Sequence, residues 1–172
     1  MKKRVLLTSI IAIVVLALVC GLLAIPNQFA EFGNNAYSGY ETIFAFKIID
    51  GKNYHTDNYG GRPSVLGIIS LVFILLGAIS LAFTKKSKSL PVLGGVCVSL
   101  SGLFFLLMDL SLATIYKRKI ALYWETYVVG GILLLLGIYL IYIGILYIRE
   151  DKIGSKADSK QYSYLKSNKK EN

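Results

Sequence analysis

Four long apolar runs constrain the fold of this chain more than any other feature. Each approaches the roughly 20 consecutive apolar residues that a helix needs to cross the hydrocarbon layer of a bilayer. Hydrophobic residues make up 55% of the 172 residues and charged residues only 17%, whereas charged residues approach a quarter of a soluble domain. We therefore expect an all-α membrane protein, a four-transmembrane-helix bundle. The expected spans cover about residues 5–25, 64–83, 91–115 and 126–148.

The three prolines of the chain lie at the expected helix ends. Pro26 follows the first apolar run, and Pro63 and Pro91 open the second and third runs. Proline is disfavoured inside a helix but tolerated in its first turn, where its missing N–H has no helical partner. The first run exceeds a usual signal-peptide core and no small-x-small cleavage site closes it, so we expect a retained helix.

The distribution of lysine and arginine predicts the orientation. With the N-terminus inside, thirteen of these residues lie in the N-terminal arm, the 84–89 linker and the tail, against six in the two external loops. The positive-inside rule then places both termini in the cytoplasm. Lys117, Arg118 and Lys119 do not fit this rule, because they would lie on the outer side. The transmembrane domain is expected over residues 1–148, with an external loop at 26–63. Residues 149–172 are expected to form a basic, disordered cytoplasmic tail.

Small residues recur at helical spacing in all four runs, and glycines mark this pattern in the third and fourth. Membrane helices associate through small residues that let their backbones approach, because lipid supplies no hydrophobic force between helices. We expect such a stripe on the third and fourth spans to pack the bundle. Its glycines are Gly95, Gly102, Gly130, Gly137 and Gly144.

One carboxylate, Asp109, lies within the third apolar run, about 28 Å from its cytoplasmic end. An ionisable group inside a membrane is costly and suggests a functional site. Ser70 and Arg62 are expected near the same level, so the three residues form a candidate intramembrane polar site. Two interpretations remain open: a structural ion pair or cap, and a proton, ion or ligand site.

The external loop contains the second candidate site. Ser38 and Glu41 have capping-box spacing, which favours a short amphipathic helix, whereas alternating residues and Asp50-Gly51 favour a hairpin. A helix followed by a turn or hairpin is the slightly favoured interpretation. The candidate interaction residues are Tyr40, Glu41, Ile43, Phe44 and Phe46.

The box Ser38-Gly39-Tyr40-Glu41-Thr42-Ile43-Phe44, between spans one and two and followed by a lysine-rich linker, resembles that of small four-span bacterial membrane proteins of unknown function. A longer first and shorter second external loop is also similar to the claudin layout. The Trp and paired Cys of the claudin first loop are absent, so this likeness covers topology alone and carries over no functional residue.

No catalytic, cofactor or metal motif stands out, and the lone His55 cannot make a metal site. The net charge of +9 is concentrated at the ends of apolar runs, which is typical of membrane topology and not of nucleic-acid binding. The expected function is that of a non-enzymatic interaction, accessory or envelope protein in a bacterial cell membrane. Its partners would be the lipid bilayer and another membrane or envelope protein or a second copy. The alternative is a small ion or solute transporter or channel component that uses Asp109.

Overall fold

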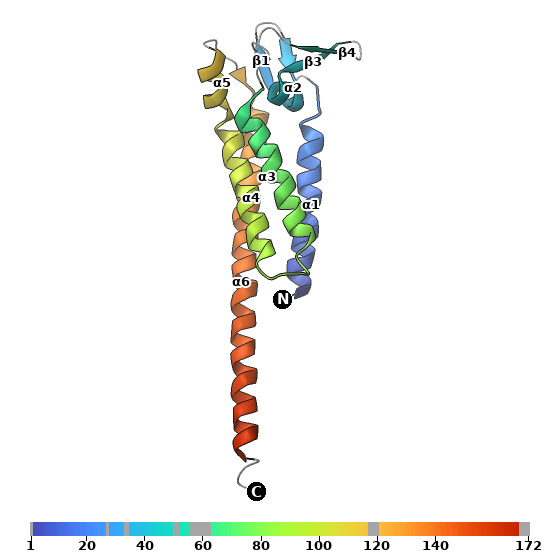
Figure 1. The fold of residues 1–172 in the computed structure, drawn as a ribbon. Coiled ribbons are helices and arrows are strands. Elements are labelled where there is room, and N and C mark those ends of the chain that lie inside the picture. Colours follow the sequence, from blue (N-terminus) through green and yellow to red (C-terminus); the bar gives the residue numbers. More distant parts are fainter. Residues whose placement is uncertain are drawn as a thin grey trace.

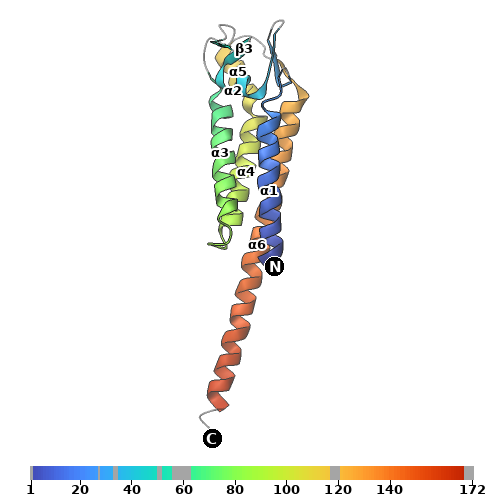
Figure 2. The same ribbon diagram turned by 90° about the vertical axis from the view of Figure 1, so that its right-hand side faces the viewer.

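The computed structural model describes residues 2–26, 28–32, 35–49, 52–55, 63–116 and 121–168. Figure 1 shows a helical bundle with a small cap at one end, and Figure 2 shows the same arrangement from the side. The helices are α1 (Lys2–Leu22), α2 (Gly39–Phe44), α3 (Val65–Ala82), α4 (Leu90–Leu106), α5 (Met108–Tyr116) and α6 (Trp124–Asn168). The strands are β1 (Ala30–Phe32), β2 (Asn35–Tyr37), β3 (Phe46–Ile49), β4 (Lys52–His55) and β5 (Ala121–Leu122).

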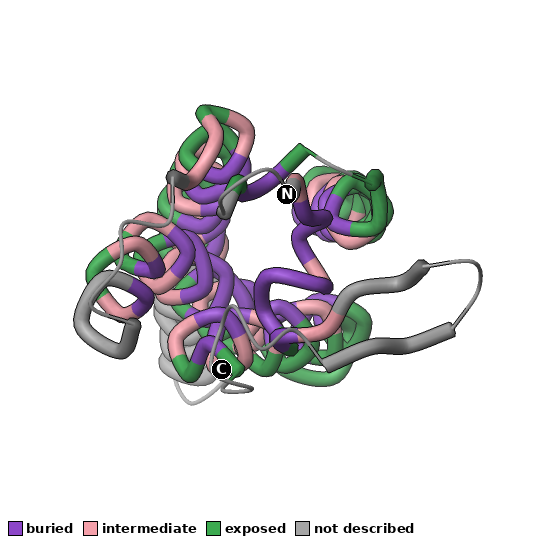
Figure 3. The backbone as a smooth tube through the Cα atoms, turned by 90° about the horizontal axis from the view of Figure 1, so that it is seen from above, coloured by how far each residue is buried: buried purple, intermediate pink, exposed green. Residues whose placement is uncertain are grey.

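Apolar side chains cover the outside of the bundle as well as its core. The inner face of α1 is buried, whereas Leu7 and Leu18 on its other faces are 60% and 63% exposed. Leu75 of α3 and Leu135 of α6 are similarly exposed. Figure 3 shows the buried positions facing the middle of the helix arrangement. An apolar exterior of this extent indicates a membrane environment, because soluble monomers rarely expose large contiguous apolar patches.

Among the described residues, three helical segments are long and apolar enough to cross a membrane: Lys3–Leu22, Val65–Ala82 and Trp124–Glu150. The fourth apolar helix, α4, is shorter at 17 residues. The expected helical membrane bundle is thus present in its coarse form, with helices that begin where Pro63 and Pro91 predict.

Helices α4 and α6 pack along each other more extensively than any other pair, through the predicted glycines. A Cβ atom on Gly102 would lie 2.5 Å from the backbone nitrogen of Leu134 and 2.7 Å from the carbonyl oxygen of Gly130. A Cβ atom on Gly137 would meet Ser99 and, at 2.7 Å, the carbonyl oxygen of Gly95. Only glycine permits this backbone separation. We call this contact the α4–α6 glycine seam, formed by Gly95, Gly102, Gly130, Gly137 and Gly144.

Three strands from two different loops form one sheet in the cap. The order is β2-β1-β5, all antiparallel, with Ala30 opposite Tyr37 on one side and opposite Leu122 on the other. The carbonyl oxygen of Phe29 accepts hydrogen bonds from the Tyr123 N–H and the Thr126 hydroxyl, both at 3.0 Å. The connections before α2 and before α6 are therefore joined into one unit.

Both alternatives for the external loop contribute to the structure. Ser38 and Glu41 form a complete capping box at the start of α2, which confirms that prediction. Ala45 then adopts the left-handed conformation, with φ of 55°, and turns the chain into the antiparallel β3–β4 pair. Asp50 and Gly51, predicted to make the hairpin turn, lie outside the described residues.

The third span differs from the single helix expected over residues 91–115. Helix α4 ends at Leu106, and α5 begins at Met108. Leu107 has φ of −86° and ψ of −2°, and its carbonyl accepts the Leu110 N–H at 3.1 Å, so a tighter i to i+3 turn interrupts the α-helical ladder. Asp109 consequently lies in the first turn of α5, where the helix dipole favours a negative charge.

The tail also differs from the prediction. Helix α6 continues to Asn168, so the segment expected to be disordered from residue 149 is helical in the structure over most of its length. This segment contains no proline and only one glycine, Gly154, and its lysines, alanine and glutamine have good helix propensity. Figures 1 and 2 show this part of α6 extending well beyond the other helices.

Candidate functional site

Three of the five predicted interaction residues make contacts inside the protein. Ile43 has no exposed surface, and a Cβ atom on Gly67 would lie 2.8 Å from its Cγ1 atom. Glu41 is 7% exposed, and its Oε2 atom accepts the Ser38 N–H at 2.7 Å. The Tyr40 hydroxyl donates to the carbonyl oxygen of Cys20 at 3.0 Å. Burial raises the pKa of the Tyr40 phenol, so this donor stays protonated.

The backbone of the α2 region also holds the ends of two long helices. The Tyr40 N–H donates to the carbonyl oxygen of Leu23, directly after α1, at 3.1 Å. The Ser64 N–H, directly before α3, donates to the carbonyl oxygen of Ile43 at 2.7 Å. Helix α2 is therefore a lid that closes the bundle between α1 and α3.

The remaining two predicted residues form the outward part of this lid. Phe44 is 42% exposed, and its ring stacks on that of Phe46 with centroids 6.4 Å apart. We call Phe44 and Phe46 the aromatic pair. It lies where α2 leads into the β3–β4 pair, which projects sideways from the cap in Figure 1.

The three residues of the predicted polar site do not form one described site. Ser70 is fully buried on α3, where its hydroxyl donates to the carbonyl oxygen of Ser101 at 2.9 Å. The Ser101 hydroxyl lies 2.8 Å from that of Ser70 and donates to it, because the Ser70 proton is already engaged. Asp109 is half-buried, and its Oδ2 atom accepts a long 3.4 Å hydrogen bond from the Tyr127 hydroxyl. Arg62 lies outside the described residues.

Tyr123 joins the two loops at the rim of the cap. The Tyr123 hydroxyl donates to Oε2 of Glu31, on β1, at 3.0 Å. This hydrogen bond, together with the negative charges of Glu31 and Glu125, raises the pKa of Tyr123. The phenol therefore stays protonated as a donor throughout the physiological pH range.

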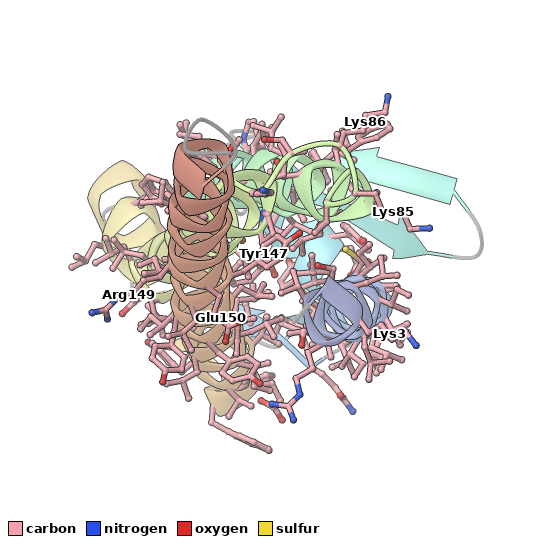
Figure 4. All side chains as sticks on the ribbon, turned by 90° about the horizontal axis from the view of Figure 1, so that it is seen from below. Lys3, Lys85, Lys86, Tyr147, Arg149 and Glu150 are labelled. Atoms are coloured by element: carbon pink, nitrogen blue, oxygen red, sulfur yellow. The ribbon has the colours of Figure 1, made fainter. Side chains whose placement is uncertain are left out.

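The opposite end of the bundle contains a cavity of about 620 Å³ that composition alone does not reveal. It lies between the start of α1, the turn from α3 to α4, and Tyr147 of α6. Figure 4 views this end from below and labels Lys3, Lys85, Lys86 and Tyr147. We call it the basic cavity. Its lining residues are Lys3, Val5, Leu6, Thr84, Lys85, Lys86, Ser87, Lys88 and Tyr147.

A buried hydrogen bond connects two walls of the basic cavity. The Thr84 hydroxyl donates to the carbonyl oxygen of Leu81 at 2.5 Å, so the Ser9 hydroxyl, 3.2 Å away on α1, donates to Thr84. Both side chains are buried. This bond ties α1 to the α3–α4 turn.

Sequence patterns identify the lysines of this end only as topological signals. The up-and-down order of the first two spans would bring the Lys2–Arg4 arm and the 84–89 linker to one end of a bundle. Nothing in the spacing of α6 singles out Tyr147 as a wall between them, and neither Ser9 nor Thr84 has a recognisable pattern.

The described side chains do not assemble a metal site. They contain no group of three His, Cys, Asp or Glu residues that could hold a metal ion. No protein-family model matches the chain, and no curated protein matches it. The two ends of the bundle, one closed by the lid and the other containing the basic cavity, are therefore the features on which a function can be argued.

Proposed function

We propose that this chain is a four-span protein of a bacterial cell membrane that acts non-enzymatically, as an interaction or accessory protein, through the outward face of its cap. The observation that carries the proposal is the construction of the cap. Tyr40 and Ile43 hold the ends of α1 and α3 through hydrogen bonds, whereas Phe44 of the aromatic pair is exposed on the surface and Phe46 is half-buried.

The arrangement of positive charges supports cytoplasmic termini. Lys3 and Arg4 lie at the start of α1, and Lys85, Lys86 and Lys88 lie in the α3–α4 turn at the same end. Arg149 follows Tyr147, which lines the cavity between these segments. An excess of lysine and arginine on one side is typical of the cytoplasmic face. The cap then lies outside the cell.

The lengths of α4 and α5 support a fourth crossing. Helix α4 alone rises about 26 Å, which is less than the roughly 30 Å of a hydrocarbon core. The 9 residues of α5 extend the same segment past Leu107 towards the cap. The two helices together can therefore complete one span, and the turn between them lies near the outer boundary.

The aromatic pair is the part of the cap best suited to a protein partner. Aromatic side chains are enriched at the centres of protein interfaces, because they bury a large area with few rotatable bonds. The two-stranded β3–β4 pair follows immediately and, within the described residues, pairs with no further strand. An unpaired strand edge can receive an extended segment of a partner.

The transporter alternative has less support. The three polar residues that would line a path have separate partners or fall outside the described residues, and Ser70 is engaged within the tightly packed α3–α4 contact. Asp109 lies in the first turn of α5 beside an exposed hydrogen bond to Tyr127, where it stabilises a helix start.

A photocrosslinking amino acid placed at Phe44 in living cells is expected to capture a discrete partner, or a second copy of the chain, as a band of higher mass. Placed at Gln28, which is exposed in the same cap, it is expected to give no such band. The Asp109→Asn variant should leave the Phe44 product unchanged. The product is identified by mass spectrometry of the isolated band.

Two outcomes would argue against this function. Equal labelling from positions 44 and 28 would show that the aromatic pair has no special role. Loss of the Phe44 product in the Asp109→Asn variant, with normal amounts of protein in the membrane, would shift the function to the acid.

A further inference from the structure

We propose that the basic cavity binds the phosphate headgroup of an anionic phospholipid from the adjacent leaflet. The inference rests on the membrane placement proposed above, but it needs no protein partner. It assigns a ligand class to the end of the bundle opposite the cap.

Positive charge at the cavity is not balanced by its own walls. Lys3, Lys85 and Lys86 line it, and no acidic residue does. The segments that supply these lysines contain no Asp or Glu, since the chain has none before Glu31 and none between Asp57 and Asp109. Glu150 follows Tyr147 on α6, but it is exposed and does not line the cavity.

The shape of the cavity favours a lipid over a free anion. Val5, Leu6 and the Tyr147 ring supply apolar walls that inorganic phosphate could not use. Lys85 and Lys86 line the cavity, and in Figure 4 their ammonium groups point away from the bundle. These flexible side chains would turn towards a phosphate at the cavity mouth when the lipid binds. A phospholipid matches this arrangement, because its acyl chains and glycerol meet apolar walls while its phosphate meets the rim.

The position of the cavity fits the headgroup layer. Helix α3 ends at Ala82, and the lining residues Thr84–Lys88 follow directly. Thr84 is fixed by its hydrogen bonds to Leu81 and Ser9, and the Lys86 ammonium lies 4.8 Å from the centre of the Phe83 ring. The Thr84 wall of the cavity is thus ordered before any ligand binds, whereas Lys86 would leave the Phe83 ring to reach a phosphate.

Tryptophan quenching of the full chain in detergent micelles tests the proposal. Trp124 is the only tryptophan and is distant in sequence from the cavity, so a Trp124→Phe/Tyr147→Trp protein reports from the cavity wall. Brominated phosphatidylglycerol is expected to reach half-maximal quenching at a mole fraction at least about fivefold below that of brominated phosphatidylcholine. In the Lys3→Ala/Lys85→Ala/Lys86→Ala background this preference should fall below about twofold.

The tail supplies the matched control. Lys152→Ala/Lys156→Ala/Lys160→Ala removes the same charge and is expected to keep the preference for phosphatidylglycerol. Circular dichroism checks that each variant folds. If the cavity triple variant does not fold, Lys85→Ala alone, at an exposed position, should give a partial loss of preference.

Three outcomes overturn the proposal. They are equal quenching by both lipids, an equal loss of preference in the tail variant, and reversal of quenching by excess inorganic phosphate, which would indicate a free anion as the ligand. Because the assay contains no other protein, a failed crosslinking experiment at Phe44 does not affect its outcome.

Discussion

Replacing Gly137 with alanine is expected to lower the free energy of unfolding by about 1–3 kcal/mol, the usual cost of overpacking a well-packed core. The added Cβ atom would meet the backbone and side chain of Ser99 and the carbonyl oxygen of Gly95. Backbone atoms cannot rotate away as a flexible side chain can, so α4 and α6 must separate. Gly102→Ala, which meets backbone atoms of Leu134 and Gly130, should have a similar effect.

Gly131 provides the control for the glycine seam, because a Cβ atom there would meet nothing within 4 Å. Gly131→Ala should be neutral or slightly stabilising, since alanine has the higher helix propensity. Thermal unfolding of the purified protein in detergent, followed by the loss of the monodisperse peak, measures all three variants. Equal melting temperatures for Gly137→Ala and Gly131→Ala would contradict the seam.

Ile43→Ala is expected to destabilise the protein by about 2–5 kcal/mol, as buried large-to-small substitutions do. The side chain of Ile43, on α2, is completely buried and packs against Gly67 of α3. Its loss leaves a gap under the lid, and the lid also holds Leu23 and Ser64 through backbone hydrogen bonds. The same thermal assay, with proteolysis of the cap as a second readout, measures the effect.

Phe44→Ala is the matched control for the lid, because Phe44 is adjacent in sequence but 42% exposed. It should change stability little while removing half of the aromatic pair. A similar loss of stability in the Ile43→Ala and Phe44→Ala variants would show that α2 does not pack inward as described.

Several features of the fold can be predicted from the sequence alone. Apolar length, the prolines and the seven-residue spacing of Gly130, Gly137 and Gly144 depend on local geometry, and they predict helix starts and the packing face of α6. The capping box at Ser38 and Glu41 is likewise a local pattern, and it is present. Such features require only that neighbouring residues share one element.

The remaining features depend on contacts between distant segments. Tyr40, Glu41 and Ile43 form an amphipathic pattern that predicts one packed face but not whether it packs on the bundle or on a partner. Two-residue β5 gives no strand signal before it pairs with β1. No proline or glycine marks the interruption at Leu107, so the continuous apolar run predicts a single helix there.

The polar positions illustrate the same limit. Depth along a helix placed Asp109 and Ser70 at similar levels, but depth does not specify the facing helix. Ser70 of α3 meets Ser101 on α4, whereas Asp109, beyond the interruption on α5, meets Tyr127 on α6. Charge alone identifies the lysines of the basic cavity, whereas the cavity also needs Tyr147 of α6 as a wall.

We propose that the cap, in which β1 and β5 join both loops, lies outside the cell while the basic cavity lies inside. Labelling of variants with one added cysteine by a membrane-impermeant maleimide tests it directly, and the natural chain, with its free Cys20 and Cys97, gives the background signal. Gln28→Cys and Lys119→Cys should label in intact cells, and Ser87→Cys only after the membrane is opened. Labelling of Ser87→Cys in intact cells, or of Gln28→Cys and Lys119→Cys from opposite sides, would contradict the account.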